Sequence, residues 1–364
     1  MGFMRIPVNI DLEHTALGQQ LNRQAADRRS FLKAAGMGLA VPAIVATGAT
    51  AFAQDATPPA DGGAYEGGHG GMGTGDATPE PGTPAPFTVY DPVLPAVKPG
   101  PKEFSLVAKD ATVYVGKDMA YAGWTFNGTI PGPVFRAVEG DDITVHVGNE
   151  AGMTHSVDTH AAKTPTKNYK NVAPGESWTW TFKASTPGAF MYHCGTAPVL
   201  MHIGAGMYGA MIVDPKDGWS PAQEFVFIQS EFYFEDKDAP IKVPSMAKMM
   251  LASGAMMDIV AFNGYANQYV EHPIAIKVGE PVRIFVVNAG PNVWSSFHVV
   301  GAIFDKAYIN ANPANELHGL QGITIGPGDG ACVEFTVEEP GEYIAVNHAF
   351  GHATHGAMAI FHAE

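Results

Sequence analysis

The sequence predicts an all-β protein made of two similar β-sandwich halves. Its apolar runs are short and alternate with polar residues, and 42 glycines and 28 prolines interrupt them. Such a pattern is typical of strands that are joined by turns. Short motifs also recur in the same order in both halves, which indicates an internal duplication of one sandwich.

The start of the chain predicts an export signal over residues 1–53. Residues 27–33 read Asp-Arg-Arg-Ser-Phe-Leu-Lys, an apolar run follows over 34–50, and Ala51-Phe52-Ala53 forms a cleavage motif. This order is typical of a twin-arginine signal, whereas a membrane anchor would need a longer apolar run. Residues 54–86 are rich in Pro, Gly, Thr and Ala, so we expect a disordered linker.

The repeats place the two halves at residues 87–215 and 216–364. Strands are expected at residues 104–108, 112–115, 143–147, 178–182 and 210–213. The sequence Phe-Asn-Gly occurs at 126–128 and again at 262–264. Near the end of each half, residues 187–190 with His193 are echoed by residues 340–343 with His348. Asn347-His348-Ala349 is therefore expected to stand where His193-Cys194-Gly195 stands.

Residues 154–213 hold most of the candidate metal ligands. His155, Cys194, His202 and Met207 provide two imidazoles, one thiolate and one thioether. This is the donor set of a blue copper electron-transfer site, in which Met is the weak axial ligand. The sequence therefore predicts such a site in the first half.

A second metal site is suggested by strand parity. Side chains alternate between the two faces of a strand, so adjacent His193 and Cys194 point in opposite directions. Asp158 and His160 are two residues apart and share a face, which we expect to be the face of His193. With His348 from the second half, His160 and His193 would form a three-imidazole site with an open position, typical of a catalytic metal.

The net charge argues against one class of function, and the remaining Cys, Met and His residues have expected packing roles. The formal net charge of −15 argues against nucleic-acid binding. Cys194 is assigned to the metal, so Cys332 is expected to pack in a core, and His298 is also expected to be a core residue. Residues 246–257 contain five methionines, which we interpret as packing in a helical crossover rather than as a copper-handling patch. These are Met246, Met249, Met250, Met256 and Met257.

Five stretches together resemble the copper-containing nitrite reductases, over about residues 104–362. They are residues 126–133, 155–162, 191–194, 202–207 and 346–348. The resemblance implies two tandem cupredoxin-like Greek-key β-sandwich domains per subunit, at 87–215 and 216–364. It also implies a homotrimer with one type 1 and one type 2 copper in each subunit.

The resemblance also implies a role for each site residue. The type 1 copper ligands are His155, Cys194, His202 and Met207. The type 2 ligands are His160 and His193, together with His348 of a neighbouring subunit. Asp158 and His272 are the expected catalytic residues, and Ile274 and Val346 shape the nitrite pocket. The sequence departs from the family pattern at two places. The loop between Cys194 and His202 is one residue shorter than in the best-known members, and Gln321-Gly322 stands where an acid and a threonine that support His272 are expected.

The implied reaction is the one-electron reduction of nitrite to nitric oxide, in denitrification or nitrate assimilation. The electron would come from a small cupredoxin or c-type cytochrome, and the protein would act in the periplasm or on the outer face of the cytoplasmic membrane. Two alternatives are a two-domain multicopper oxidase and a non-catalytic electron carrier. The oxidase needs His-x-His pairs, which the sequence lacks, and the carrier would not need Asp158, His272 and His348.

Overall fold

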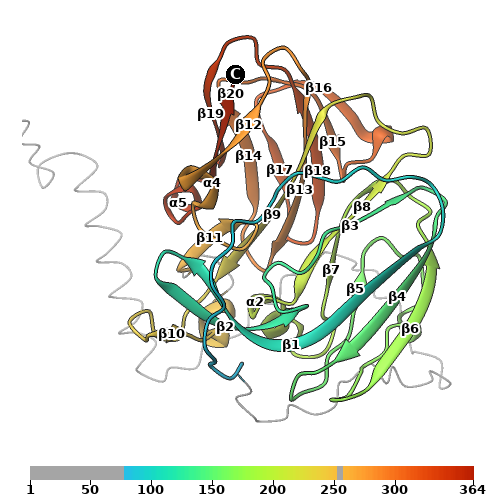
Figure 1. The fold of residues 1–364 in the computed structure, drawn as a ribbon, viewed down its shortest axis with the longest axis vertical. Helices are drawn as coiled ribbons and strands as arrows, with labels where there is room; N and C mark the ends of the chain where they lie inside the picture. Colours follow the sequence, from blue (N-terminus) through green and yellow to red (C-terminus); the bar gives the residue numbers. More distant parts are fainter. Residues whose placement is uncertain (1–77, 252–256) are drawn as a thin grey trace, which may run out of the picture. The chain divides into compact units, whose positions relative to one another are not determined.

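The computed structural model describes residues 78–251 and 257–364, which form β-strands with a few short helices (Figure 1). The expected all-β class is therefore confirmed. The export signal, residues 54–77 of the linker and Met256 lie outside the described residues. Among the helices of the described ranges, not one has the length and apolar character to cross a bilayer.

Two sheets are built mainly from the first half. The larger has the order β10-β2-β1-β4-β6 and the smaller has the order β3-β8-β7-β5. The larger contains β1 (Lys102–Gly116), β2 (Met119–Phe126), β4 (Asp142–Asn149), β6 (Ser177–Lys183) and β10 (Ile241–Lys242). The smaller contains β3 (Phe135–Val138), β5 (Asp158–Thr159), β7 (Gly188–His193) and β8 (Tyr208–Asp214). In β4 alternate residues are buried, as expected for a strand with one face on the core.

The strands expected at 104–108 and 112–115 form one continuous strand, β1. Residues 102–108 pair with β4, whereas residues 108–116 pair with β2. The chain therefore changes pairing partner at Ala108 without leaving the extended conformation.

Two further sheets form the second half. Their orders are β11-β9-β13-β18-β15-β16 and β12-β20-β19-β14-β17. The first contains β9 (Gln223–Phe232), β11 (Ile259–Phe262), β13 (Val282–Gly290), β15 (Phe304–Ile309), β16 (Glu316–Leu320) and β18 (Gly330–Phe335). The second contains β12 (His272–Ile276), β14 (Ser295–Val300), β17 (Ile323–Ile325), β19 (Gly341–Asn347) and β20 (Met358–Ala363).

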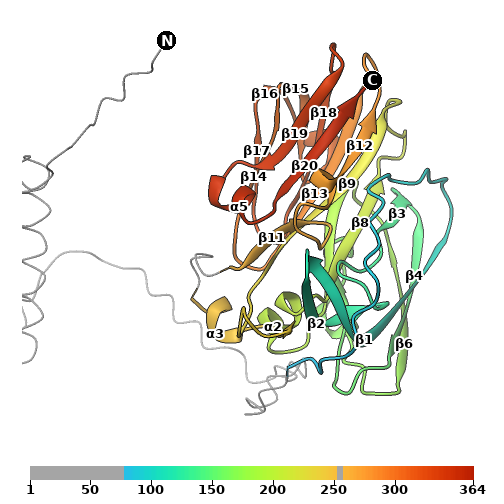
Figure 2. The same ribbon diagram turned by 60° about the vertical axis from the view of Figure 1, so that its left-hand side comes forward.

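Short helices lie between the strands. They are α2 (Val199–Gly204), α3 (Met246–Met249), α4 (Gln268–Glu271), α5 (Phe350–Thr354), and the 3-10 turns η2 (Thr166–Asn168) and η3 (Pro313–Asn315). Helix α3 lies beside α2, and a Cβ on Gly204 would meet the side chain of Met249 (Figure 2). Met249 is fully buried, which supports a packing role there, whereas Met250 is 62% exposed.

The duplication appears in matching hydrogen bonds. Asn127 and Asn263 follow β2 and β11 and have φ of +59° and +53°, a region that Asn tolerates better than most residues. Asn127 Oδ1 accepts the Val107 N–H at 2.7 Å, and Asn263 Oδ1 accepts the Ile228 N–H at 2.7 Å. The two Phe-Asn-Gly motifs thus make the same turn against equivalent strands.

A buried strand and an ion network join the halves. Every residue of β13 is buried, because Ile284 packs into the core of the second half and Phe285 into the core shared with the first. Cys332 belongs to this shared core, so its predicted packing role is confirmed. All described residues belong to one compact unit, and the boundary at residue 215 stays a prediction.

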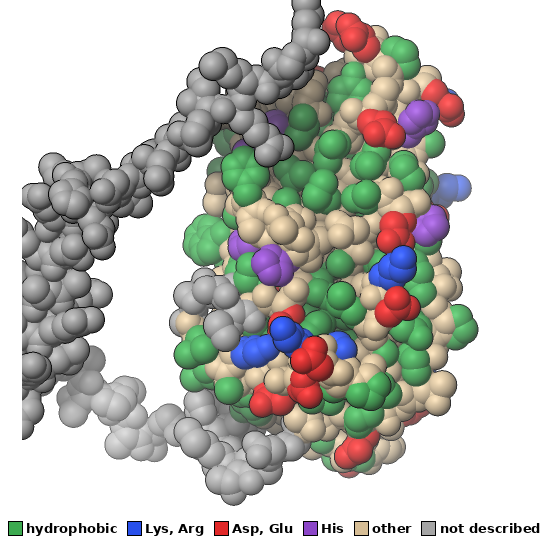
Figure 3. Space-filling model, turned by 90° about the vertical axis from the view of Figure 1, so that its left-hand side faces the viewer, with side chains coloured by type: hydrophobic (Ala, Val, Ile, Leu, Met, Phe, Trp, Pro, Cys, Tyr) green, Lys and Arg blue, Asp and Glu red, His purple; other side chains and the backbone are tan. Residues whose placement is uncertain are grey.

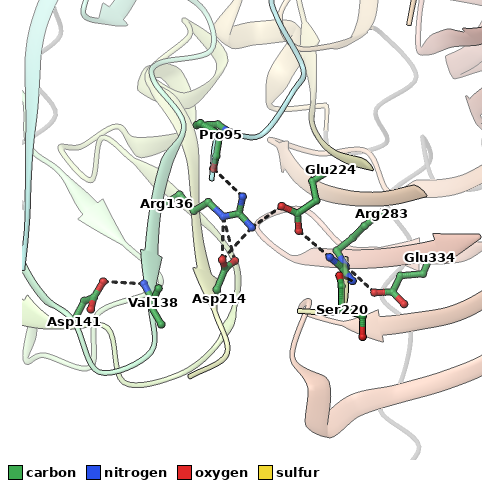
Figure 4. Close-up of polar contacts among 9 residues, drawn as sticks. All are labelled: Pro95, Arg136, Val138, Asp141, Asp214, Ser220, Glu224, Arg283 and Glu334. Atoms are coloured by element: carbon green, nitrogen blue, oxygen red, sulfur yellow. Dashed lines mark hydrogen bonds and ion pairs between the residues drawn. The ribbon is translucent and has the colours of Figure 1, made fainter. Parts of the chain in front are cut away.

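Glu224 links two arginines across this junction (Figure 4). Its carboxylate oxygens lie 2.8 Å from Arg136 of β3 and 2.8 Å from Arg283 of β13. Arg136 also pairs with Asp214 at 3.0 Å, and Arg283 pairs with Glu334 at 2.7 Å. Desolvation offsets much of the attraction in such buried pairs, so the network contributes less to stability than its short distances suggest.

The end of the expected linker is attached to the first half. Gly82 donates its N–H to Thr112 Oγ1 at 2.8 Å, and Ala85 donates its N–H to the Thr112 carbonyl at 3.2 Å. Pro79 is buried. The expectation of a disordered linker up to residue 86 therefore does not describe Gly82 and Ala85, which Thr112 on β1 holds by hydrogen bonds.

Candidate functional site

Three of the four expected blue-copper ligands converge at one end of the first sandwich. His155 lies in the loop before β5, Cys194 directly follows β7, and His202 lies on α2. Cys194 Sγ is 3.2 Å from His202 Nδ1 and 3.8 Å from His155 Nδ1. The donor atoms of all three lie within 4.8 Å of one another. Met207 is fully buried, and its carbonyl accepts the Cys194 N–H at 3.0 Å.

Burial controls the protonation of this group. Desolvation lowers the pKa of His155 to about 4 and that of His202 to about 3, so both imidazoles are neutral at pH 7. Burial also raises the pKa of the Cys194 thiol, although the Ser156 N–H lies 3.4 Å from its sulfur. Neutral imidazoles beside a buried thiol and a buried thioether fit a copper ion, whose charge would favour the thiolate.

A second histidine pair lies on the other side of β7. His160 Nε2 and His193 Nε2 are 3.3 Å apart. Each ring uses its other nitrogen on a backbone carbonyl, since His160 Nδ1 lies 3.1 Å from the Gly328 oxygen and His193 Nδ1 lies 3.0 Å from the Cys194 oxygen. Such hydrogen bonds fix the orientation of metal-binding imidazoles. The predicted separation of the two ligand sets by strand parity is therefore observed.

Asp158 accompanies this pair. It is paired with His193 between β5 and β7, and its Oδ2 lies 4.0 Å from His193 Nε2. Its side chain is 33% exposed. Burial, together with the nearby Asp158 carboxylate, raises the pKa of Tyr169 above its usual value. A carboxylate thus stands beside His193 Nε2, the atom that faces His160 Nε2.

His348 lies elsewhere in the single chain. It follows β19 in the second half, and its ring is 4.5 Å from the ring of Phe350. Within the described residues, the candidate metal-ligand group of three or more contains His155, Cys194 and His202, so His348 does not join His160 and His193. Figure 3 faces the side that carries α5, where histidines lie among hydrophobic side chains.

His272 and Ile274 do not lie beside His348. Both are on β12, and β20 separates β12 from β19 in the sheet. His272 is exposed, whereas Ile274 is 7% exposed and packs in the core of the second half. The pocket predicted for Ile274 is therefore wrong, because its side chain faces the interior of the sandwich.

His298 is the histidine that lies beside His348. Their ring centroids are 5.2 Å apart, and His298 is paired with Val346 across β14 and β19. His298 Nδ1 donates to the carbonyl of Gln321, so Gln321 supports His298 and not His272. Val300, two residues further on β14, is 47% exposed.

The expectation that His298 is a core residue was wrong, and strand parity could have prevented the error. Phe297 and Val299 are fully buried, so His298 and Val300 face away from the core. The alternation was already visible in the sequence Phe-His-Val-Val.

The second half carries a close counterpart of the blue-copper frame. In the first half the Cys194 N–H donates to the Met207 carbonyl at 3.0 Å, and the Met207 N–H donates to the His202 carbonyl. In the second half the Asn347 N–H donates to the Ala357 carbonyl at 3.1 Å, and the Ala357 N–H donates to the His352 carbonyl.

Asn347 therefore takes the place of Cys194, and His348 takes that of Gly195. The expected correspondence between His348 and His193 is wrong by two residues, because Val346 takes the place of His193. Counted from Gly188 and Gly341, which begin β7 and β19, Cys194 and Asn347 occupy the same position.

Comparison with known proteins places these features in context. The residue pattern of a family described as multicopper oxidase matches residues 108–218. A copper-containing nitrite reductase from Neisseria gonorrhoeae is 37% identical over 266 residues, which cover 70% of this chain and 67% of the relative. A copper-containing nitrite reductase from Pseudomonas chlororaphis is 30% identical, covering 62% of this chain and 67% of the relative.

Solved structures of copper nitrite reductases and of a multicopper oxidase are also similar to this chain. A copper nitrite reductase from Nitrosomonas europaea superposes with a TM-score of 0.67 at 37% identity, covering 72% of this chain and 94% of that one. A copper-containing nitrite reductase from Thermus scotoductus gives 0.65 at 33% identity, covering 72% and 62%. A solved multicopper oxidase gives 0.64 at 27% identity, covering 72% and 89%. The cupredoxin-like fold is common to all of them.

Proposed function

Because the chain belongs to the copper-containing nitrite reductase family, we propose that it reduces nitrite to nitric oxide. The reaction takes one electron and two protons and releases water. The enzyme is thus an oxidoreductase, and the proposal concerns its product, its electron path and the residues that act.

The observation that carries the proposal is the arrangement around His193 and Cys194. Cys194 Sγ belongs to the group with His155 and His202, whereas His193 Nε2 lies 3.3 Å from His160 Nε2. When bound, copper supplies one-electron redox chemistry at the first group and a Lewis-acidic position for nitrite at the second. The peptide bond between Cys194 and His193 gives the two groups a short covalent connection.

Two titratable side chains suit a reaction that consumes two protons. Asp158 Oδ2 lies 4.0 Å from His193 Nε2, within reach of an oxygen bound at that side. For the second group we propose His298 in place of His272, since its ring adjoins His348 and Gln321 orients it. Val346, already expected in the nitrite pocket, pairs with His298 across β14 and β19, and Val300 lies two residues beyond His298 on β14. We propose that Val300 takes the place of Ile274 as the second apolar wall.

Assembly follows from the position of His348. A single chain keeps His348 apart from His160 and His193, so a neighbouring subunit has to supply it. A closed ring of three heterologous contacts satisfies this requirement and gives one type 2 site at each interface.

Subunit mixing tests the assembly. Chains carrying His348→Ala and chains carrying His160→Ala should each be inactive, because every interface lacks one ligand. Co-expressed chains should regain part of the activity. At some interfaces the intact His160 of one chain then meets the intact His348 of its neighbour. Separate inactive populations with no recovery after co-expression would contradict the shared site.

We also propose where the protein acts and which kind of protein donates its electron. The twin-arginine motif at residues 27–33 supports export to the periplasm or to the outer face of the cytoplasmic membrane. A small cupredoxin or a c-type cytochrome would supply the electron, in denitrification or nitrate assimilation. Detection of the mature protein outside the cytoplasm, and loss of export after replacement of Arg28 and Arg29 by Lys, test the location.

Copper content distinguishes the proposal from its rivals. A multicopper oxidase would require His-x-His pairs that the sequence lacks, and Gly195 follows Cys194 where a histidine is needed. We expect one blue and one non-blue copper per chain by metal analysis and electron paramagnetic resonance. A blue signal alone would indicate an electron carrier, and more than two coppers per chain would indicate the oxidase.

A further inference from the structure

Asn347 is a fully buried side chain with an unusually complete set of partners. Its Oδ1 accepts the N–H of Ser296 at 3.0 Å and that of Ala349 at 3.2 Å. Its Nδ2 lies close to three acceptors on different elements. These are Gln229 Oε1 at 3.0 Å, the Trp294 carbonyl at 3.1 Å and His352 Nδ1 at 2.9 Å.

These contacts parallel those of the Cys194 sulfur in the first half. There the Ser156 N–H points at Cys194 Sγ at 3.4 Å, and His202 Nδ1 lies 3.2 Å from the same sulfur. In the second half the Ser296 N–H points at Asn347 Oδ1, and His352 Nδ1 lies beside Nδ2. The Asn347 side-chain amide, which both donates and accepts hydrogen bonds, thus connects the segments of Ser296 and His352. In the first half a metal bound to Cys194 would connect the equivalent segments.

The backbone around His348 depends on this amide. The His348 N–H donates to the Ser296 carbonyl at 2.7 Å, while the Ser296 N–H donates to Asn347 Oδ1. On the other side of His348, the Ala349 N–H donates to the same Oδ1. The ring of His348 is exposed, so its own contacts hold it less firmly than the backbone does.

We propose that Asn347 is a positioning residue for His348, which fixes the imidazole for the type 2 copper. The inference rests on the proposed function, because it assigns His348 to that metal. Residues that orient a ligand typically contribute about 10–100-fold to metal affinity. Loss of the amide should weaken the non-blue site by that factor and leave the blue site unchanged, since Cys194, His155 and His202 all lie in the first half.

Two variants and one control test the proposal on the purified assembled protein. Asn347→Leu removes every hydrogen bond of the amide, whereas Asn347→Asp keeps the acceptor for the Ser296 and Ala349 N–H groups. Asn263→Leu is the control, because Asn263 is an equally buried residue of the same half whose amide contacts Val226, Ile228 and Tyr269 instead. Copper affinity is measured by competition with a chelator, and the hyperfine splitting of the non-blue copper by electron paramagnetic resonance.

We expect copper affinity to fall in the order wild type, Asn347→Asp, Asn347→Leu, with altered hyperfine splitting and unchanged blue absorption. Asn263→Leu should lower the unfolding temperature without changing either copper signal. Wild-type affinity and splitting in Asn347→Leu would overturn the inference, as would an equal loss in Asn263→Leu.

If Asn347→Leu does not assemble, the smaller Asn347→Ala, which also removes the acceptor of the Ser296 and Ala349 N–H groups, decides: wild-type affinity and splitting there would overturn the inference. His348→Ala separates this result from a failure of the proposed function. If that variant keeps its non-blue copper, the assignment of His348 is wrong. If it loses the copper while Asn347→Leu keeps it, the positioning role alone is wrong.

Discussion

His193 and Cys194 are adjacent in the chain, and His193 Nδ1 donates to the carbonyl oxygen of Cys194 at 3.0 Å. The hydrogen bond directs His193 Nε2 away from the thiol and toward His160. One end of β7 therefore presents a sulfur to one side and an imidazole to the other. This relationship allows separate predictions for the two groups.

Replacement of Cys194 by Ser should abolish the intense blue colour, because the colour arises from bonding between thiolate and copper. The non-blue copper should stay bound, since His160 and His193 keep their carbonyl partners. Visible absorption and metal analysis of the purified variant measure both effects. Persistence of the blue band would show that Cys194 is not a ligand.

Replacement of Asp158 by Asn should reduce turnover by about 10²–10⁴-fold, the range that a positioned acid contributes. Both coppers should remain bound and the blue spectrum should not change. Anaerobic kinetics with a reduced dye, on protein of measured copper content, gives the comparison.

Asp142→Asn is a suitable control for this variant. Asp142 is 71% exposed and pairs with Lys183, and turnover should be close to that of the wild type. If Asp158→Asn lost copper and added copper restored its rate, Asp158 would serve to orient a ligand and not to transfer protons.

His298→Phe should lower turnover strongly, whereas His272→Phe should have little effect. His298 adjoins His348 and is oriented by Gln321, while His272 is exposed at the start of β12. A general acid or base typically contributes 10²–10⁴-fold, so the two variants should be easily distinguished by turnover at saturating nitrite. The opposite order would restore His272 as the catalytic residue.

Glu231 predicts a pH dependence of stability. Burial raises its pKa to about 7, although the N–H groups of Asn292 and Val293 and the Tyr233 hydroxyl oppose this shift. Between pH 4.5, its ordinary pKa, and about 7, the folded chain keeps a proton that the unfolded chain has lost. The free energy of unfolding should therefore fall as the pH rises through this window, by on the order of 3 kcal/mol.

Glu231→Gln should remove this contribution, because an amide does not titrate. Urea unfolding of the wild type and the variant at pH 5 and pH 7.5 measures the difference between the two slopes. Parallel stability curves for the two proteins would mean that Glu231 ionises alike in the folded and unfolded chains.

The sequence was sufficient to bring His155, Cys194 and His202 together and to place His193 and Cys194 on opposite sides. Both depend on local spacing, since one step along a strand reverses the face. Contacts between segments distant in sequence were harder to predict. His298 and His348 meet through the pairing of β14 with β19, and the pairing partner of a strand is not evident from a single histidine. The position of His348 could have been counted from the sequence, because Cys194 follows Gly188 at the same spacing as Asn347 follows Gly341.

The most direct test of the account is the anaerobic reaction of the fully copper-loaded protein with nitrite and a reduced dye. Nitric oxide is measured with an electrode, and dye oxidation is followed in parallel. We predict one nitric oxide released for each electron consumed, with no such reaction in His348→Ala. A protein that holds both coppers, accepts electrons from the dye and yet releases no nitric oxide would contradict the proposed function.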